Sequence, residues 1–218
     1  MKAVIVSDVH IGSKHSLAPL FLEFVRRLPP EVMLILNGDT MHVRHWRPRV
    51  PEPEALALLR AESFRRPVVW VYGNHDEGYK LPDPGKIEFR PSYSIGKRLF
   101  ISHGYDFDNV MPYHRTFIAV FRAIHHLRVW LGAEAVHVAQ YAKKWKRLYE
   151  VLLKNVLMNA VEYAKEHGYE AVTCGHTHFV EDVTVDGIRY INTGAWTERP
   201  VYFLCVDDEH MDLVKVAD

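Results

Sequence analysis

The chain has 218 residues, of which 48% are hydrophobic and 25% are charged, and its 27 basic residues balance 27 acidic ones. This length and composition fit one large α/β domain of an ordinary soluble globular protein. The formal net charge of zero argues against a chain that attracts nucleic acid or anionic membranes through its overall charge.

The N-terminus and the cysteines indicate the cellular compartment. The first apolar run, residues 3–6, ends at once in Ser7 and Asp8, so we expect no signal peptide. Cys174 and Cys205 lie in apolar, strand-like runs and are expected to be buried thiols rather than a disulfide. These features predict a cytoplasmic protein and leave association with a membrane surface open.

Taken in chain order, short apolar runs that each end in polar residues predict five buried strands. The runs cover residues 3–6, 32–36, 67–72, 98–102 and 171–174. Helices are predicted over residues 17–28 and 54–64. The proline- and glycine-rich residues 81–91 are predicted to form a loop. Strands that alternate with helices favour an α/β fold, which binds its ligands outside the carboxyl ends of its strands.

Residues 105–167 differ from the rest of the chain. Two long helical stretches, 116–131 and 133–167, meet at Gly132, and Gly168 is the expected C-cap of the second. One apolar stripe comprises Phe117, Val120, Phe121, Ile124, Leu127 and Leu131, and the other comprises Trp145, Leu148, Tyr149, Leu152 and Val156. We predict a helical insertion, within the single domain of residues 1–218, that caps the site and selects the substrate.

After residue 168 the chain returns to strands. An Asp186-Gly187 pair between residues 180–185 and 188–191 predicts a β-hairpin. Residues 201–206 and 211–216 are two further predicted strands. These short neighbouring strands predict sheets that are not purely parallel.

Metal-binding side chains follow each of the five main strands. Asp8 and His10 are two residues apart, so in an extended segment they would point the same way and bind one cation together. Taken alone, Asp39 could cap a helix, and a lone histidine such as His103 is more often a hydrogen-bonded loop histidine than a ligand. Together, seven side chains are expected at one edge of the sheet: Asp8, His10, Asp39, Asn74, His103, His176 and His178. Mixed oxygen and imidazole ligands suit a pair of divalent ions such as Mn, Fe, Co or Zn.

These motifs resemble a known family. In order, they are Asp8-x-His10, Gly38-Asp39, Gly73-Asn74-His75-Asp76, His103-Gly104 and Gly175-His176-Thr177-His178. They are similar to the motifs of the calcineurin-like metallophosphoesterase superfamily. The resemblance implies two packed mixed β-sheets flanked by helices, and two divalent cations, with Mn first and Fe, Zn, Co or Ni as alternatives. One cation would take Asp8, His10, Asp39 and His178, and the other would take Asp39, Asn74, His103 and His176.

The resemblance also implies a mechanism. Two cations about 3.5–4 Å apart share a bridging water and lower its pKa, and the resulting hydroxide attacks phosphorus in line. His75, held by Asp76, would protonate the leaving oxygen as general acid, with a structural turn residue as the alternative for His75. We therefore predict an enzyme, a metal-dependent hydrolase of a phosphodiester or a pyrophosphate.

A narrower resemblance concerns the substrate. The motif of residues 175–178, the run of residues 190–196 and the insertion after His103-Gly104 are similar to UDP-2,3-diacylglucosamine hydrolases. That branch cleaves a pyrophosphate and holds acyl chains in its insertion. Two positions depart from it, because the branch usually has Arg at the position of His75 and Asp at the position of Tyr105.

Side chains outside the motifs have two explanations each. Arg44 and Arg47, with His45, either hold substrate phosphate or belong to a solvated loop, and both remain open. A basic run on the insertion either contacts lipid headgroups or, by default, forms a solvated helix face: Lys143, Lys144, Lys146 and Arg147. Three aromatic residues are expected in the core rather than at a ligand: Trp130, Trp145 and Tyr149.

Three classes of function compete on these observations. The complete ligand set favours an enzyme that acts on a phosphorylated small molecule or a lipid-linked substrate, with peripheral membrane contact through the insertion as a further option. A nuclease of the same superfamily would carry a basic stripe, so the neutral charge disfavours nucleic acid as a partner. A metal-free interaction scaffold would have lost ligands, and none is lost here.

Overall fold

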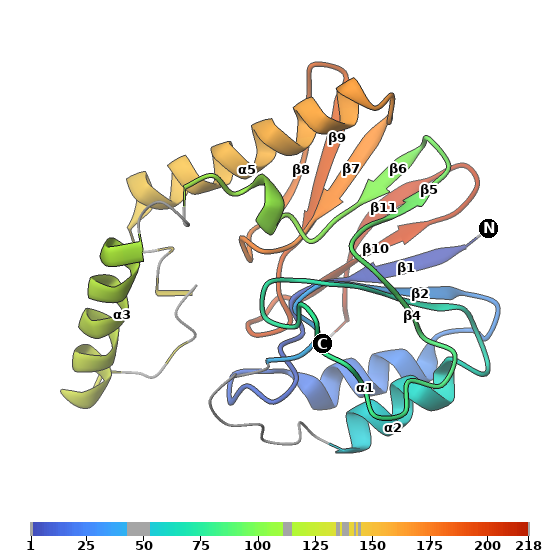
Figure 1. Ribbon diagram of the computed structural model, residues 1–218, viewed down its shortest axis with the longest axis horizontal. Helices are drawn as coiled ribbons and strands as arrows, with labels where there is room; N and C mark the ends of the chain where they lie inside the picture. Colours follow the sequence, from blue (N-terminus) through green and yellow to red (C-terminus); the bar gives the residue numbers. More distant parts are fainter. Residues whose placement is uncertain are drawn as a thin grey trace.

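The computed structural model describes residues 2–42, 53–110, 115–133, 136, 140–141, 143 and 145–217 (Figure 1). Two β-sheets pack face to face, with helices on their outer faces. Both sheets contain parallel and antiparallel neighbours. The predicted fold class, two packed mixed sheets flanked by helices, is therefore confirmed.

The first sheet has the strand order β11-β10-β1-β2-β3-β4. Its strands are β1 (Ala3–Val6), β2 (Met33–Asn37), β3 (Val68–Val71), β4 (Glu88–Arg90), β10 (Tyr202–Val206) and β11 (Met211–Lys215). β1 to β4 run parallel, whereas β10 pairs antiparallel with β1 and with β11. Helices α1 (Ala18–Arg27) and α2 (Pro53–Glu62) join the first three strands. As a result, β1, β2 and β3 all end at the same edge.

The second sheet has the strand order β5-β6-β7-β9-β8. Its strands are β5 (Tyr93–Ile95), β6 (Leu99–Ile101), β7 (Ala171–Cys174), β8 (Val180–Val185) and β9 (Ile188–Thr193). β6, β7 and β9 run parallel. Between β6 and β7 the chain passes through the short helix η1 (Tyr105–Phe107), α3 (Arg115–Trp130) and α5 (Lys146–Glu166).

The core forms three apolar layers, because successive side chains of a strand point to opposite faces. In β1, Val4 contributes to the cluster under α1 and α2, while Ile5 contributes to the cluster between the two sheets. A third cluster lies between the second sheet and α5, around Leu157 and Val161. This packing fixes both sheets and holds their strand ends in place.

The predicted hairpin is confirmed. Asp186 and Gly187 have φ angles of 52° and 82° at the turn between β8 and β9. Two positive φ angles are what a two-residue turn of this twist requires, and Asp-Gly adopts them at low cost.

Two short strands depart from the prediction. β4 lies inside residues 81–91, which we expected to be a loop, and β5 had no predicted counterpart. Each has only three residues, and β4 alternates two charged residues around Phe89. A run this short carries too few inward side chains for a period of two to be recognised.

The second helix of the insertion also starts later than predicted. α5 begins at Lys146, and the backbone of Trp145 lies outside the helical region. The predicted start at residue 133 was therefore wrong. Its buried stripe is confirmed at Tyr149, Leu152 and Val156.

Apolar side chains at and just beyond the C-terminal end of α3 are exposed. Leu127 is 55% exposed, Trp130 80% and Leu131 70%, and α3 lies apart from the two sheets, beyond the N-terminal end of α5 (Figure 1). The prediction that Trp130 belongs to the core was wrong, whereas Tyr149 is buried as predicted. Trp145 is 40% exposed. The insertion therefore has one helix that completes the core and one that presents apolar surface.

Candidate metal centre

Five loops meet where the strands of the two sheets end. β1, β2 and β3 belong to the first sheet, whereas β6 and β7 belong to the second. The expectation that all seven side chains lie at one edge of one sheet was therefore wrong. Backbone bonds join the loops: Asp8 N–H donates to Gly38 O at 3.1 Å, and Gly175 N–H donates to His103 O at 2.9 Å.

The candidate ligands have unusual backbone conformations. Positive φ angles between 48° and 62° occur at Asp8, His10, Asp39, His176 and His178. The segments around Asp8 and His176 are therefore not extended, and our geometric reason for pairing residues two apart was wrong. Left-handed conformations cost an L-residue roughly 1–2 kcal/mol each. Backbone strain of this kind clusters at functional sites, where the surrounding structure enforces it.

Two glycines of the motifs allow the loops to approach closely. A Cβ atom at Gly38, where φ is 79°, would lie 2.3 Å from the ring of His103. A Cβ at Gly175 would lie 2.2 Å from Asp8 Oδ2. Each glycine therefore packs directly against a candidate ligand from another loop, which explains why these loops need glycine.

One half of the centre is buried. The Nε2 atoms of His10 and His178 lie 3.2 Å apart, and His178 Nε2 lies 3.2 Å from Asp8 Oδ1. His10 Nε2 is 3.8 Å from one oxygen of Asp8 and from Oδ2 of Asp39. None of these four side chains is more than 5% exposed. The structure thus brings together the four residues that we assigned to the first cation.

The other half opens to solvent. Asp39 Oδ2 lies 3.4 Å from His103 Nε2, and Asn74 Oδ1 lies 3.1 Å from His176 Nδ1. Asn74 is exposed and the side chain of His176 is 16% exposed. A substrate therefore has access to the side on which we placed the second cation.

His103 provides a test of whether a cation fits. Its Nδ1–H donates to Asn37 O at 3.0 Å, and its Nε2 faces the carboxylates of Asp39 and Asp8. That buried Nε2 makes no hydrogen bond among the described residues, and neither does Asp8 Oδ1. Two buried carboxylates that face one ring nitrogen require a positive charge between them, and a metal ion would supply it, so these residues fit a cation.

The electrostatics of the centre point the same way. Burial lowers the pKa of His103, but the charges of Asp39 and Asp8 outweigh it and raise that pKa to about 10. Without a cation the ring therefore carries the positive charge between the carboxylates, and a bound cation would take the place of that proton. Burial raises the pKa of Asp8, but His103 and His178 outweigh it and lower that pKa to about 2. The pKa of Asp39 is likewise held well below its usual value. Both carboxylates are therefore ionised at neutral pH, as metal ligands must be.

Asp76 has a different role from the one we predicted. Its Oδ2 accepts hydrogen bonds from Thr40 N–H, Met41 N–H and Trp70 Nε1–H, and its Oδ1 accepts one from Gly73 N–H. Burial and the nearby Asp39 raise the pKa of Asp76 to about 6. Asp76 therefore ties the loop after β2 to the loop after β3, and the described residues give it no hydrogen bond to the ring of His75.

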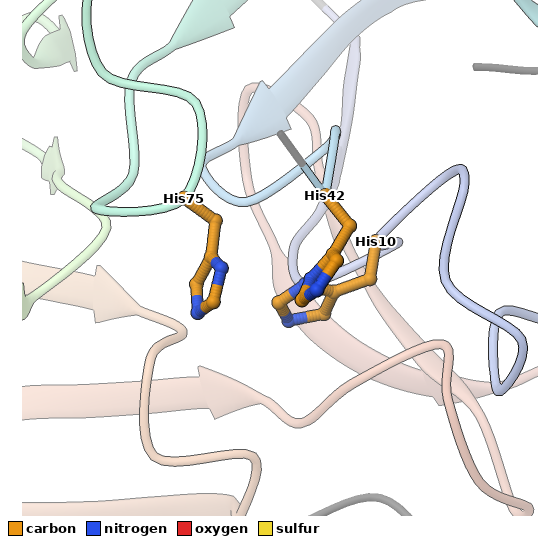
Figure 2. Close-up of side chains that lie close together, drawn as sticks. All are labelled: His10, His42 and His75. Carbon is orange, nitrogen blue, oxygen red and sulfur yellow. The ribbon is translucent and has the colours of Figure 1, made fainter. Parts of the chain in front are cut away.

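Figure 2 shows His75 beside His10 and His42, which come from three different loops. His75 N–H donates to Asp39 Oδ1 at 2.7 Å, and its ring stacks on His42 with centroids 4.9 Å apart. His42 Nδ1 lies 3.4 Å from His10 Nδ1. Sequence reasoning missed His42, although it lies in the same loop as Asp39, only three residues further on.

A second missed residue is Asp108, which lies just after η1. Its Oδ2 is 2.9 Å from His176 Nε2, and its side chain is 2% exposed. A buried carboxylate beside a candidate ligand is a partner that only the tertiary structure identifies.

Only some of the side chains predicted to contact substrate or lipid headgroups lie within the described residues. Arg44 and Arg47, with His45, lie outside the described residues, as does Lys144. Lys143 pairs with Glu198, while Lys146 and Arg147 are exposed. Within the described part of the basic run, one side chain therefore forms an ion pair and two are exposed to solvent.

A sandwich of two mixed sheets whose strand ends gather Asp, His and Asn side chains defines a metal-centred phosphoesterase fold. The chain belongs to the calcineurin-like phosphoesterase superfamily, whose domain model matches residues 1–209. No curated protein matches the chain by sequence.

Solved structures share this fold at low sequence identity. An archaeal phosphodiesterase is 17% identical with a TM-score of 0.52, and the match covers 99% of this chain and 100% of that one. A Vps29 mutant from Entamoeba histolytica is 14% identical with a TM-score of 0.50, covering 99% and 98%. Among the described residues, no helix combines the length and apolar character needed to cross a membrane.

Proposed function

We propose that this chain is a dinuclear metal-dependent phosphoesterase that hydrolyses a phosphodiester or a pyrophosphate bond. One observation carries the proposal: Asp39 Oδ2 faces the Nε2 atoms of His103, His10 and His75 at 3.4, 3.8 and 3.9 Å. A carboxylate oxygen between ligands of both halves is the arrangement of a bridging ligand. Mn is the cation that we favour, with Fe, Zn, Co and Ni as alternatives.

When bound, two divalent cations would lower the pKa of a water between them and neutralise charge on the phosphoryl oxygens. The chain's own residues divide the remaining work. Asp8, His10 and His178 hold the buried half, so they exclude bulk solvent from it. The ring of His75 is 33% exposed and lies beside His10 of the buried half, and we assign it the role of general acid that would protonate the leaving oxygen.

The test is a metal titration followed by a substrate screen. Protein stripped with a chelator should hydrolyse bis(p-nitrophenyl) phosphate only after Mn is added, and metal analysis should find two ions per chain. A chain that takes up no divalent ion under these conditions would contradict the proposal. Monoesters, diesters and UDP-sugar pyrophosphates should then be compared at the same metal concentration.

A lipid-linked UDP-sugar is the second candidate substrate class. The observation that favours it is the apolar surface of α3, where Leu127, Trp130 and Leu131 are 55%, 80% and 70% exposed. Exposed apolar side chains on an insertion that begins directly after His103 suit the acyl chains of an amphiphilic substrate. Lys146 and Arg147 are exposed on α5 and would suit its anionic part or a membrane surface. A nuclease remains disfavoured because the chain has no net positive charge.

A further inference from the structure

His176 has partners at both of its ring nitrogens. Nδ1 lies 3.1 Å from Asn74 Oδ1, and Nε2 lies 2.9 Å from Asp108 Oδ2. An ionised carboxylate only accepts hydrogen bonds, so Nε2 must carry the proton. The Nδ1 lone pair is then free to bind a cation beside Asn74 Oδ1.

Asp108 is itself held firmly in place. Its Oδ1 accepts a hydrogen bond from Val110 N–H at 2.9 Å, and its own N–H donates to Tyr105 O at 3.1 Å. The side chain of Asp108 is 2% exposed. Two acceptor oxygens with two different donors leave this carboxylate little freedom to rotate.

The helix α5 forms hydrogen bonds with the segment that carries Asp108. Asn159 Nδ2–H donates to Phe107 O, and Asn109 N–H donates to Asn155 Oδ1, both at 2.8 Å. α5 also reaches the loop that carries His176, because the Tyr149 hydroxyl donates to Thr177 O. One helix therefore fixes both partners of the hydrogen bond between Asp108 and His176.

We propose that Asp108 is a positioning residue that holds His176 in the Nε2–H tautomer and in the orientation needed to bind the cation at the open half. Through Asp108, α5 becomes a structural part of the metal centre. Carboxylate partners of ligating histidines commonly do this, and their loss weakens metal affinity about 10–100-fold. The inference rests on the dinuclear centre of the proposed function.

Asp108→Asn is the sharpest variant. An amide has one acceptor oxygen, so it serves either Val110 N–H or His176 Nε2–H but not both. We expect calorimetric titration with Mn to show one site unchanged and one site weakened about 10–100-fold. At one equivalent of Mn per site, electron paramagnetic resonance should show an uncoupled Mn spectrum where the wild type shows a coupled pair. Asp186→Asn, in the exposed hairpin turn between β8 and β9, removes the same charge outside the centre and should bind both ions normally.

The outcomes separate the two proposals. A wild-type chain that binds no Mn overturns both, whereas an Asp108→Asn variant that binds two ions as tightly as wild type overturns only this inference. Should Asp108→Asn fold poorly, histidine 15N NMR of the Zn-loaded wild type still decides: the Nε2–H tautomer at His176 supports the inference, and the Nδ1–H tautomer overturns it.

Discussion

At the scale of single residues, Asp39 faces candidate ligands from both halves of the centre. Its Oδ1 accepts a hydrogen bond from His75 N–H, and its Oδ2 lies near the Nε2 atoms of His10 and His103. In the proposed centre Asp39 would contribute to both cations, so its loss should be felt at both sites.

Asp39→Asn should lower bound Mn from two ions toward none and reduce diester hydrolysis by more than about a hundredfold. Metal analysis and an assay with bis(p-nitrophenyl) phosphate measure both effects. Asp186→Asn is the matched control, because Asp186 lies in the exposed hairpin turn with φ 52°, a conformation that Asn tolerates. Normal metal content in Asp39→Asn would rule out the bridging role.

His75 tests the assignment of the acid. His75→Ala should lower turnover about a hundredfold or more and leave two Mn ions bound. The loss should shrink for nitrophenolate leaving groups, which need no proton, and persist for alkoxide leaving groups. His210→Ala, at a side chain that is 64% exposed, should change neither. Equal losses for both kinds of leaving group would assign His75 to another role.

At the scale of elements, α5 belongs to the core. Leu157 is 9% exposed and packs in the cluster between α5 and the second sheet. Leu157→Ala should lower the free energy of unfolding by about 2–4 kcal/mol, because it removes buried methyl groups and leaves a cavity. Urea denaturation measures the change, and Met158→Ala, at a side chain that is 41% exposed, should cost less than about 0.5 kcal/mol. A similar cost for both variants would mean that α5 does not pack as described.

The helix α3 can be tested separately. Because α5 completes the core, removing the whole insertion would also remove core packing, so point substitutions are the better probe. A variant with Leu127→Gln, Trp130→Gln and Leu131→Gln should keep wild-type stability and wild-type hydrolysis of small diesters, since these side chains are exposed. If acyl chains bind there, it should lose about tenfold or more in preference for acylated over unacylated UDP-sugar, since burying apolar groups contributes about 0.8 kcal/mol per CH₂. An unchanged preference would remove α3 from substrate recognition.

At the scale of the whole molecule, the centre joins the two sheets. Asp8, His10 and Asp39 follow strands of the first sheet, whereas His103 and His178 follow strands of the second. A cation bound by ligands from both sheets stabilises only the folded chain, in which these ligands are together.

Bound Mn should therefore raise the thermal stability of the protein. At free Mn one hundred times the Kd, each site adds about 2.7 kcal/mol to the free energy of unfolding. A scanning calorimetry series in EDTA and in rising Mn measures the shift, which Asp39→Asn should largely abolish. Mg at concentrations where it does not bind serves as the control for ionic strength. A melting temperature independent of Mn would show that no cation is bound between the ligands of the two sheets.

The sequence by itself determined much of this protein. The buried strands are recognisable in the sequence as apolar runs, and the seven candidate ligands follow these runs. This order is expected because α/β folds bind their ligands in the loops at the carboxyl ends of the strands. The turn at Asp186-Gly187 was also predictable from the sequence, because few residue pairs adopt two positive φ angles at low cost. Local chemistry of this kind is encoded by neighbours in the chain.

Only the tertiary structure decided how these parts combine. It divided the strands between two sheets, placed Asp76 under backbone N–H groups rather than beside the ring of His75, and brought Asp108 to His176 across 68 residues of chain. It also exposed Leu127 while burying Tyr149, although both lie in apolar helical stripes. These outcomes depend on which surfaces pack together, and burial and hydrogen bonding between distant segments leave no periodic signal in the sequence.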